Sequence, residues 1–163
     1  MEETDYVREA ESIALFNTGL APLPFIHVPR VFPGLSSPKV ITMTRLPGQH
    51  LDDFLATRPS RALRDLVGER LVELFYFQLL RLAALHADPH WGNYLFNPDG
   101  TIGLIDFGCV KRLRPAFVAD LQEFLLYPGS RRTPEFLKLL DRRYAGVGGR
   151  DLDHDVRACQ PVP

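Results

Sequence analysis

Three oxygen-bearing side chains stand at spacings that suit metal-assisted chemistry on phosphate groups. Asp88 and Asn93 lie five residues apart, and Asp106 opens an Asp-Phe-Gly sequence thirteen residues after Asn93. Carboxylate and amide oxygens are the ligands that a hard cation such as Mg²⁺ prefers. Phosphoryl transfer depends mainly on charge neutralisation and alignment, so these residues indicate that chemistry.

A β-hairpin is expected to bring the two metal-binding candidates together. Short β-rich runs at 93–97 and 101–106 flank the turn sequence Asn-Pro-Asp-Gly. With a loop of four to five residues, the numbers of facing residues sum to about 199. Asn93 would then face Asp106, with their Cα atoms roughly 5 Å apart. The arrangement predicts a magnesium site at the open end of the hairpin.

Composition indicates a globular protein and argues against some classes of partner. The chain has 163 residues, of which 45% are hydrophobic and 24% charged, and its formal net charge is −1. This content is typical of a folded domain. The charge gives no reason to expect nucleic-acid binding, which needs a basic surface. Two cysteines, Cys109 and Cys159, lack metal-ligand spacing and favour a reducing cytoplasm over a disulfide scaffold.

The most apolar stretch, 71–85, predicts a buried central helix rather than a membrane span. It is interrupted by Glu73, Gln78 and Arg81 and is too short to cross a bilayer. On a helical wheel these polar residues form one stripe, and apolar or aromatic side chains cover the remainder. The acidic start of the chain lacks a secretion signal. A cytoplasmic location is therefore expected.

Capping and periodicity signals outline the other elements. The proline-rich segment 20–38 should be extended, and the alternating segment 39–45 should form a strand. Ser60 should cap the long helix that contains the apolar stretch. One side of the first helix should carry Val7, Ala10, Ile13 and Ala14. The predicted helices span 2–16, 51–58, 61–86, 115–126 and 134–144.

These residues resemble the UbiB (AarF-domain) atypical kinase-like proteins. The family's loop, His-x-Asp-Pro-His-x-Gly-Asn, stands here at 86–93, and its metal motif stands at 106–108. The strand ending in Met-Thr-Arg-Leu-Pro-Gly at 43–48 is similar to the family's hinge segment. A characteristic acidic pattern, Glu-x-Asp with a later Glu, is similar to Glu3, Asp5 and Glu9. The similarity covers about residues 2–145.

The resemblance implies an α+β fold. Its main part would be a mainly helical protein-kinase-like C-lobe, with a small β-hairpin carrying the metal site. The first helix and one or two strands would be a remnant of the N-lobe. The implied kinase-like domain spans 2–145, divided into the remnant at 2–45 and the C-lobe at 46–145. A flexible tail would follow at 146–163.

The resemblance also implies roles and cofactors. Asp88 would be catalytic, Asn93 and Asp106 would bind Mg²⁺, and Glu9 would pair with a strand lysine. The cofactors would be Mg²⁺ and ATP. Residues implied to contact the nucleotide are Met43 at the adenine hinge, Glu3, Asp5 and His90. For Glu3 and Asp5, ordinary charges at a helix N-terminus remain the alternative. His86 is expected to support the loop backbone rather than act as a base.

The sequence departs from the family at its beginning. It lacks a phosphate loop, a Val-Ala-Ile-Lys strand and a Lys-x-Gly-Gln segment, and Lys39 is the only lysine before residue 111. A domain truncated at its N-terminus is therefore expected, and whether it is active alone stays open.

Two functions remain open at this point. One is an ATP- and Mg²⁺-dependent phosphotransferase or ATPase of UbiB type, linked by resemblance to ubiquinone or other isoprenoid-lipid metabolism. An isoprenoid lipid or a membrane surface would then be a partner, and the protein would be peripheral to a membrane. The other is a non-catalytic remnant that binds nucleotide weakly or not at all.

Overall fold

The computed structural model describes residues 5–125. The chain divides into two compact units, Met1–Arg112 and Leu113–Pro163. Three sequence-based expectations lie outside the described residues: the role of Glu3, the helix at 134–144 and the tail at 146–163. No helix within the described part combines the length and the apolar character needed to cross a bilayer.

Helix α1 (Tyr6–Gly19) begins and ends later than predicted. Asp5 is its N-cap, because the carboxylate accepts a hydrogen bond from the Arg8 backbone N–H at 3.2 Å. The side that it buries carries Ile13 and Phe16, whereas Val7 is 50% exposed. Of the apolar side expected from the sequence, Ile13 is buried and Ala10 is partly buried, whereas Val7 and Ala14 are exposed. A large aromatic ring removes more apolar area from water than the alanines of the predicted side.

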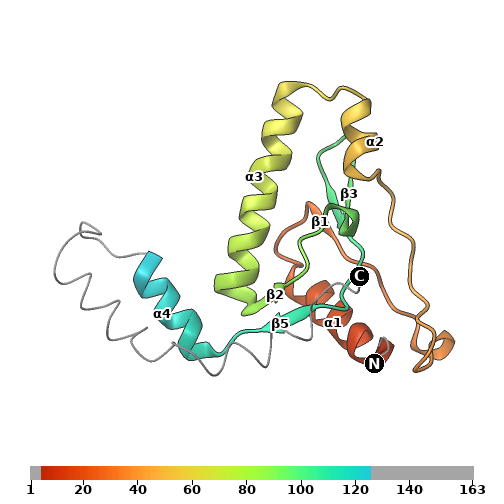
Figure 1. Ribbon diagram of the computed structural model, residues 1–163, viewed down its shortest axis with the longest axis vertical. Coiled ribbons are helices and arrows are strands. Elements are labelled where there is room, and N and C mark those ends of the chain that lie inside the picture. The colour runs from red at the N-terminus through yellow and green to blue at the C-terminus, as the bar shows by residue number, and fades with distance from the viewer. Residues whose placement is uncertain (1–4, 126–163) are drawn as a thin grey trace, which may run out of the picture. The chain divides into compact units, whose positions relative to one another are not determined.

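The long helix predicted to reach residue 86 ends earlier. Helix α2 (Leu51–Ala56) precedes it, and α3 (Arg61–Phe77) starts at Ser60, whose hydroxyl accepts from the Leu63 N–H at 3.2 Å as predicted. A π-helical segment, η2 (Gln78–Leu82), follows α3. Ala83 then adopts a left-handed conformation with φ of 53°, and strand β2 (Ala84–His86) begins. Figure 1 shows this reversal at the end of α3.

The expectation that residues 71–85 are buried nearly all round is also wrong. Val72 is 57% exposed, and Phe75 and Tyr76 are exposed by 47% and 44%. Conversely, Gln78 is only 3% exposed although it was assigned to the polar stripe. The helical wheel assumed one unbroken α-helix, and the π-helical segment and β2 change the direction of every side chain beyond residue 77.

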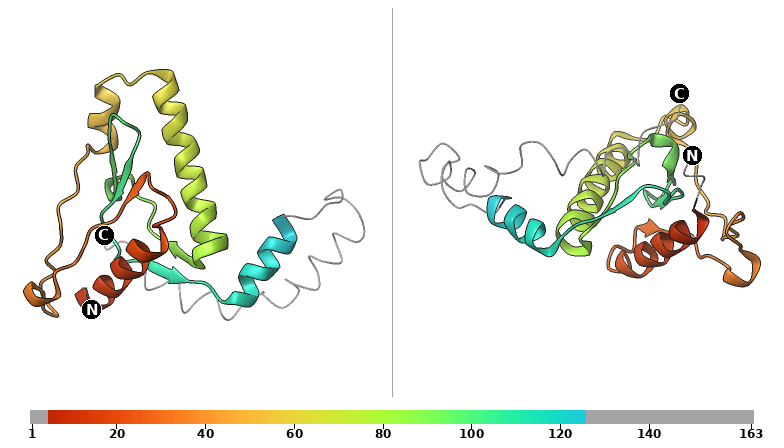
Figure 2. Two further views of the ribbon diagram at one scale, coloured as in Figure 1. Left: turned by 180° about the vertical axis from the view of Figure 1, so that it is seen from behind. Right: turned by 60° about the horizontal axis from the view of Figure 1, so that its bottom comes forward.

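Two small sheets carry the remaining strands. Strand β4 (Ile102–Leu104) lies between β1 (Ile26–His27), which is parallel to it, and β3 (Tyr94–Phe96), which is antiparallel. Strand β2 pairs with β5 (Val110–Arg112) in an antiparallel two-stranded sheet. Figure 1 shows α2 beside β3, and the chain near them can be followed from other directions in Figure 2.

The strand predicted at 39–45 does not form. This segment makes only isolated β-bridges, Val31 with Met43 and Ser37 with Val40. The facing segment contains a short 3₁₀ helix, η1 (Pro33–Leu35). Proline lacks the N–H that a continuous ladder requires, which explains why pairing stops after single bridges.

The β3–β4 hairpin is present as predicted, but its register differs by one residue. Leu95 pairs with Gly103, so facing residue numbers sum to 198, and the Asn93 carbonyl accepts from the Ile105 N–H at 3.1 Å. The loop is shorter than expected because Asn97 already bonds to Thr101, and Gly100 takes a φ of 82°. This is the three-residue loop with a left-handed glycine. Asn93 therefore faces Ile105 rather than Asp106.

The core of the first unit joins α1 to the segment that follows β4. Phe16, Phe96 and Phe107 are all at most 1% exposed. The Phe16 and Phe107 rings pack edge to face, with centroids 5.3 Å apart. The Phe of the Asp-Phe-Gly sequence is thus anchored on the first helix of the chain.

The described part of the second unit contains helix α4 (Pro115–Leu125). It begins at the predicted residue, with proline at its first position, where a missing N–H costs nothing. The Val118 N–H donates to the Arg114 carbonyl at 3.1 Å, which is the first hydrogen bond of the helix.

Candidate active site

The loop 87–93 is held by backbone bonds at both ends. At its start the Ala87 N–H donates to the Cys109 carbonyl at 2.8 Å, which continues the β2–β5 pairing. At its end a 3₁₀ turn, η3 (Trp91–Asn93), leads into β3. His90 caps that turn, because its Nδ1 accepts from the Gly92 N–H at 3.0 Å. The candidate loop is therefore a fixed connection between two sheets.

Asp88 and Asn93 are in direct contact across this loop. The Asn93 Nδ2 donates to Asp88 Oδ2 at 3.1 Å and to the Asp88 carbonyl at 3.2 Å. Because the NH₂ group of the amide faces Asp88, the amide oxygen is the atom of Asn93 that remains available to a cation. Asp88 is exposed, as an acceptor for a substrate proton would need to be.

Asp106 is positioned by contacts to its backbone and to its side chain. Its carbonyl oxygen meets Nε2 of the buried His86, and its Oδ1 accepts from the Gly108 N–H at 2.9 Å. The residue as a whole is exposed. The contact through His86 agrees with the expectation that this histidine supports backbone rather than acting as a base.

Glu9 comes to the same place from α1, almost a hundred residues away in sequence. Its Oε1 accepts from the Phe107 N–H at 3.5 Å. Burial raises the pKa of Glu9, the Phe107 N–H opposes that shift, and the negative charge of Asp106 raises the pKa further. The Tyr94 pKa is raised by burial and then by the charge of Asp88. The site therefore concentrates negative charge, which favours a cation.

A pH-dependent gain in stability is expected for Glu9→Gln. The pKa of Glu9 is raised above its ordinary value of 4.5, so folding favours its neutral form. That contribution is complete below about pH 4 and is lost as pH rises through the raised pKa of the folded protein. Glutamine keeps the acceptor for Phe107 but cannot ionise. Urea unfolding should show Glu9→Gln more stable than the wild type near pH 7, with the difference shrinking towards about pH 4.

The matched control for Glu9→Gln is Glu11→Gln, which removes an exposed charge from the same helix. Equal pH profiles for the two variants would contradict the account of Glu9. Addition of Mg²⁺ should reduce the advantage of Glu9→Gln if the ion binds beside Asp106, because a nearby cation favours the ionised carboxyl.

Three other residues were predicted to contact the nucleotide: Asp5, Met43 and His90. Asp5 has a structural role as the N-cap of α1, which is the alternative that its position allowed. Met43 is partly buried and packs against the core. His90 is exposed in the loop. Nucleotide roles for these three residues stay predictions, as does the sharing of one ion by Asn93 and Asp106.

The donor set suits magnesium chemically. Two carboxylates and one amide oxygen are hard ligands, and Mg²⁺ is commonly held by one or two carboxylates, with phosphate oxygens and waters completing the shell. Among residues 5–125 no three His, Cys, Asp or Glu side chains converge on one point. The candidate site therefore depends on the Asn93 amide and fits an ion that is shared with a ligand.

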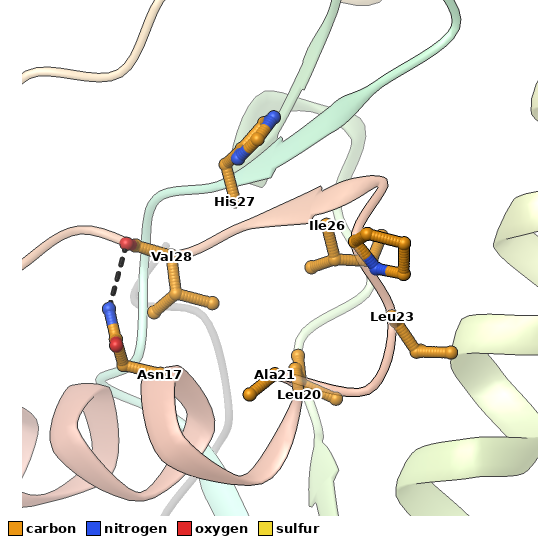
Figure 3. A pocket seen from close by; sticks show the side chains of 8 residues that line it. Asn17, Leu20, Ala21, Leu23, Ile26, His27 and Val28 are labelled. Carbon is orange, nitrogen blue, oxygen red and sulfur yellow. Dashed lines mark hydrogen bonds between the residues drawn. The ribbon is translucent and has the colours of Figure 1, made fainter.

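One hollow of the first unit lies at other residues. Figure 3 shows it at the end of α1, where the Asn17 amide donates to the Val28 carbonyl at 3.0 Å. Its lining comprises Asn17, Leu20, Ala21, Leu23, Pro24, Ile26, His27 and Val28. None of the candidate site residues is among them.

One residue near the site differs from what the sequence suggested. Gln78 is buried against the loop, with its Oε1 accepting from the His86 N–H at 2.8 Å. The sequence feature that could have indicated this role is that Gln78 is a single amide within an apolar run just before the loop motif.

The chain is similar to known kinase-like proteins. Residues 1–133 match the model of the ABC1 atypical kinase-like domain. The chain is 29% identical over 126 residues to "Atypical kinase COQ8, mitochondrial" of Saccharomyces cerevisiae, covering 77% of this chain and 25% of that protein. It is 33% identical over 118 residues to "Probable protein kinase UbiB" of Pseudomonas fluorescens, covering 70% of this chain and 22% of that protein.

Two further similarities extend over more of the chain. An uncharacterized aarF domain-containing protein kinase of Arabidopsis thaliana, described as chloroplastic, is 32% identical over 157 residues, which are 94% of this chain and 28% of that protein. A solved Mycobacterium tuberculosis structure, a complex with erythromycin, has a TM-score of 0.71 and 29% identity, covering 86% of this chain and 35% of that one. The chain thus spans about a quarter of the length of the sequence relatives named here.

Proposed function

The chain belongs to the ABC1 atypical kinase-like family, and on that premise we propose that it acts in ATP- and Mg²⁺-dependent phosphoryl transfer or ATP hydrolysis. One observation carries the proposal. The Glu9–Phe107 bond joins α1 to the segment after β4, and the bond from the Ile105 N–H to the Asn93 carbonyl joins that segment to the loop 87–93. The carboxylate and amide groups on these segments suit the metal and acceptor side of such a reaction.

Each residue has a role in the proposed reaction. Asn93 and Asp106 supply oxygen ligands for Mg²⁺, which when bound would neutralise phosphate charge. Asp88 accepts the proton of the attacking hydroxyl or water, and its bond to Asn93 fixes the distance between acceptor and metal ligand. His86 holds the carbonyl of Asp106 and so keeps the metal ligand beside the loop.

The acceptor substrate is proposed by family resemblance. UbiB-type proteins are linked to ubiquinone and other isoprenoid-lipid metabolism, so an isoprenoid lipid or a membrane surface is the proposed partner. The protein would then be peripheral to a membrane. The nucleotide partner, ATP, follows from the kinase-like family and the phosphate chemistry of the site.

A non-catalytic role is the second candidate, and Glu9 favours it. This carboxyl is partly desolvated beside Asp106, and no cation is among the groups that shift its pKa. A kinase-like site would be expected to offer a lysine to this glutamate. Without that cation the phosphates would be held from one side only, and binding of the nucleotide would be weak.

Tryptophan fluorescence can test the proposed function. Trp91 is the only tryptophan, is 52% exposed and lies two residues before Asn93. Titration with ATP should change its emission saturably when Mg²⁺ is present and not when EDTA replaces it. Measurement of phosphate release by the wild type and by Asp88→Asn then distinguishes the catalytic from the non-catalytic role. Binding without Asp88-dependent turnover supports the non-catalytic role, and no binding at millimolar Mg²⁺-ATP contradicts the kinase-like proposal.

A further inference from the structure

Gln78 is a buried polar side chain with one specific partner. It is 3% exposed at the start of η2, and its Oε1 accepts from the His86 backbone N–H at 2.8 Å. The two residues are eight apart, so this bond spans the whole reversal from α3 into β2. A bond between buried groups in such surroundings is strong, and the loss of one partner leaves the other unsatisfied.

The pairing of β2 explains why His86 needs this acceptor. In antiparallel strands the N–H groups of successive residues point to opposite sides. The Ala87 N–H donates to β5 through the Cys109 carbonyl, so the His86 N–H points away from β5. Gln78 supplies the acceptor on that side. Without it the N–H would be buried with no partner in the two-stranded sheet.

His86 connects this bond to the candidate site. Its ring is buried between Tyr94 and Phe107, with centroids 6.1 and 5.6 Å away. Its Nε2 meets the Asp106 carbonyl, while Nδ1 is buried without a partner in the described part of the chain. The ring is thus held by packing and by a single polar contact, so its position depends on how its backbone is fixed.

The reversal itself is a strained segment that needs an external support. Ala83 has a φ of 53°, a conformation that costs an alanine roughly 1 kcal/mol or more. π-Helical turns are uncommon and are enriched at functional sites. A left-handed alanine and a π-helical turn in succession would relax readily if nothing tied η2 to β2. The Gln78–His86 bond is such a tie.

We propose that Gln78 is a positioning residue of the active site. It fixes the His86 backbone, and through the His86 ring it sets Asp106 against the loop that carries Asp88. The effect of Gln78 on nucleotide binding rests on the proposed function. The positioning of His86 by Gln78 rests on the hydrogen bonds alone, so it can be tested even if the protein binds no nucleotide.

The test uses three variants of the full chain. Gln78→Met removes the acceptor at similar length, and Val67→Ala weakens the buried side of α3 elsewhere as the stability control. Gln78→Glu keeps an oxygen at the same reach and is the conservative rescue at acidic pH, where burial keeps its carboxyl protonated. If Gln78→Met does not fold, Gln78→Asn replaces it, because its amide is one methylene too short to reach. Variants are compared at urea concentrations that give equal overall stability.

The readouts are hydrogen exchange of the His86 amide, the side-chain amide resonances of Asn93, and the affinity for Mg²⁺-ATP. We expect Gln78→Met to speed His86 exchange at least about tenfold relative to Val67→Ala. It should also shift the Asn93 resonances and weaken Mg²⁺-ATP binding about tenfold, with substantial recovery in Gln78→Glu.

A Gln78→Met variant that matches Val67→Ala in exchange and in the Asn93 resonances would overturn the inference. The inference would also be overturned if Gln78→Glu restored the stability of the protein but restored neither the slow His86 exchange nor the Asn93 resonances. If the wild type binds no Mg²⁺-ATP, the proposed function fails, while His86 exchange and the Asn93 resonances still decide whether Gln78 positions the loop.

Discussion

Leu74→Asp is expected to unfold the first unit of the protein, whereas Val72→Asp is expected to leave it folded. Both residues lie on α3, but Leu74 is 2% exposed and Val72 is 57% exposed. Replacing a buried leucine by a small residue costs about 2–5 kcal/mol, and burying an unpaired carboxylate adds to that cost. A total of at least about 4 kcal/mol approaches the roughly 5–15 kcal/mol that holds a domain folded.

Circular dichroism and urea titration measure this difference directly. Leu74→Asp should lose the cooperative transition near neutral pH, and Val72→Asp should retain it with nearly the same midpoint. The comparison tests which face of α3 is buried, because the two substitutions introduce the same group two residues apart. Equal destabilisation by both variants would show that the Val72 face is also covered in solution.

Asp106→Asn is expected to remove magnesium-dependent nucleotide binding, with a loss of at least about 100-fold in affinity. Even residues that only orient a metal ligand typically contribute 10–100-fold, so the loss of a ligating carboxylate should reach the upper end of that range. The amide keeps the size of the side chain and an oxygen for the Gly108 N–H. The variant should also lower the pKa of Glu9, because one cause of its elevation is removed.

The matched control for Asp106→Asn is Asp99→Asn in the β3–β4 turn. Asp99 is an exposed carboxylate whose Oδ1 accepts from the Thr101 N–H at 2.9 Å and from its hydroxyl. Its substitution removes one negative charge from the other end of the same hairpin. Titration with Mg²⁺-ATP, followed by Trp91 fluorescence, should give the wild-type affinity for Asp99→Asn. If both variants weaken binding equally, net charge rather than ligation explains the effect of Asp106.

Local signals in the sequence predicted several elements well. The Ser60 cap and the start of α4 at Pro115 agree with the structure, because a hydroxyl cap and a first-turn proline act on their own neighbours alone. The β3–β4 hairpin was predicted from its turn residues. Its register was not, because a choice between a three-residue and a four-residue loop depends on the conformation of a single glycine, Gly100.

Features that depend on tertiary contacts were missed. The π-helical segment and the left-handed Ala83 leave no signal in the composition. The helical wheel for residues 71–85 therefore predicted that Gln78 is exposed and Phe75 is buried, whereas the structure shows the opposite. The expected strand at 39–45 had the right alternation but faced a segment containing prolines. For the site, spacing alone identified Asp88 and Asn93, which are in contact, but could not reveal the bond that ties Gln78 to His86.

We propose that Asp88, Asn93 and Asp106 surround one divalent cation. Paramagnetic broadening by Mn²⁺ in place of Mg²⁺ can detect such an ion, because the amide resonances nearest to it broaden first. Substoichiometric Mn²⁺ should broaden the Asn93 and Asp106 amides together, and Asp106→Asn should abolish this broadening. Broadening centred on another acidic pair, such as Asp52 and Asp53 in the first turn of α2, and unaffected by Asp106→Asn, would contradict the proposal.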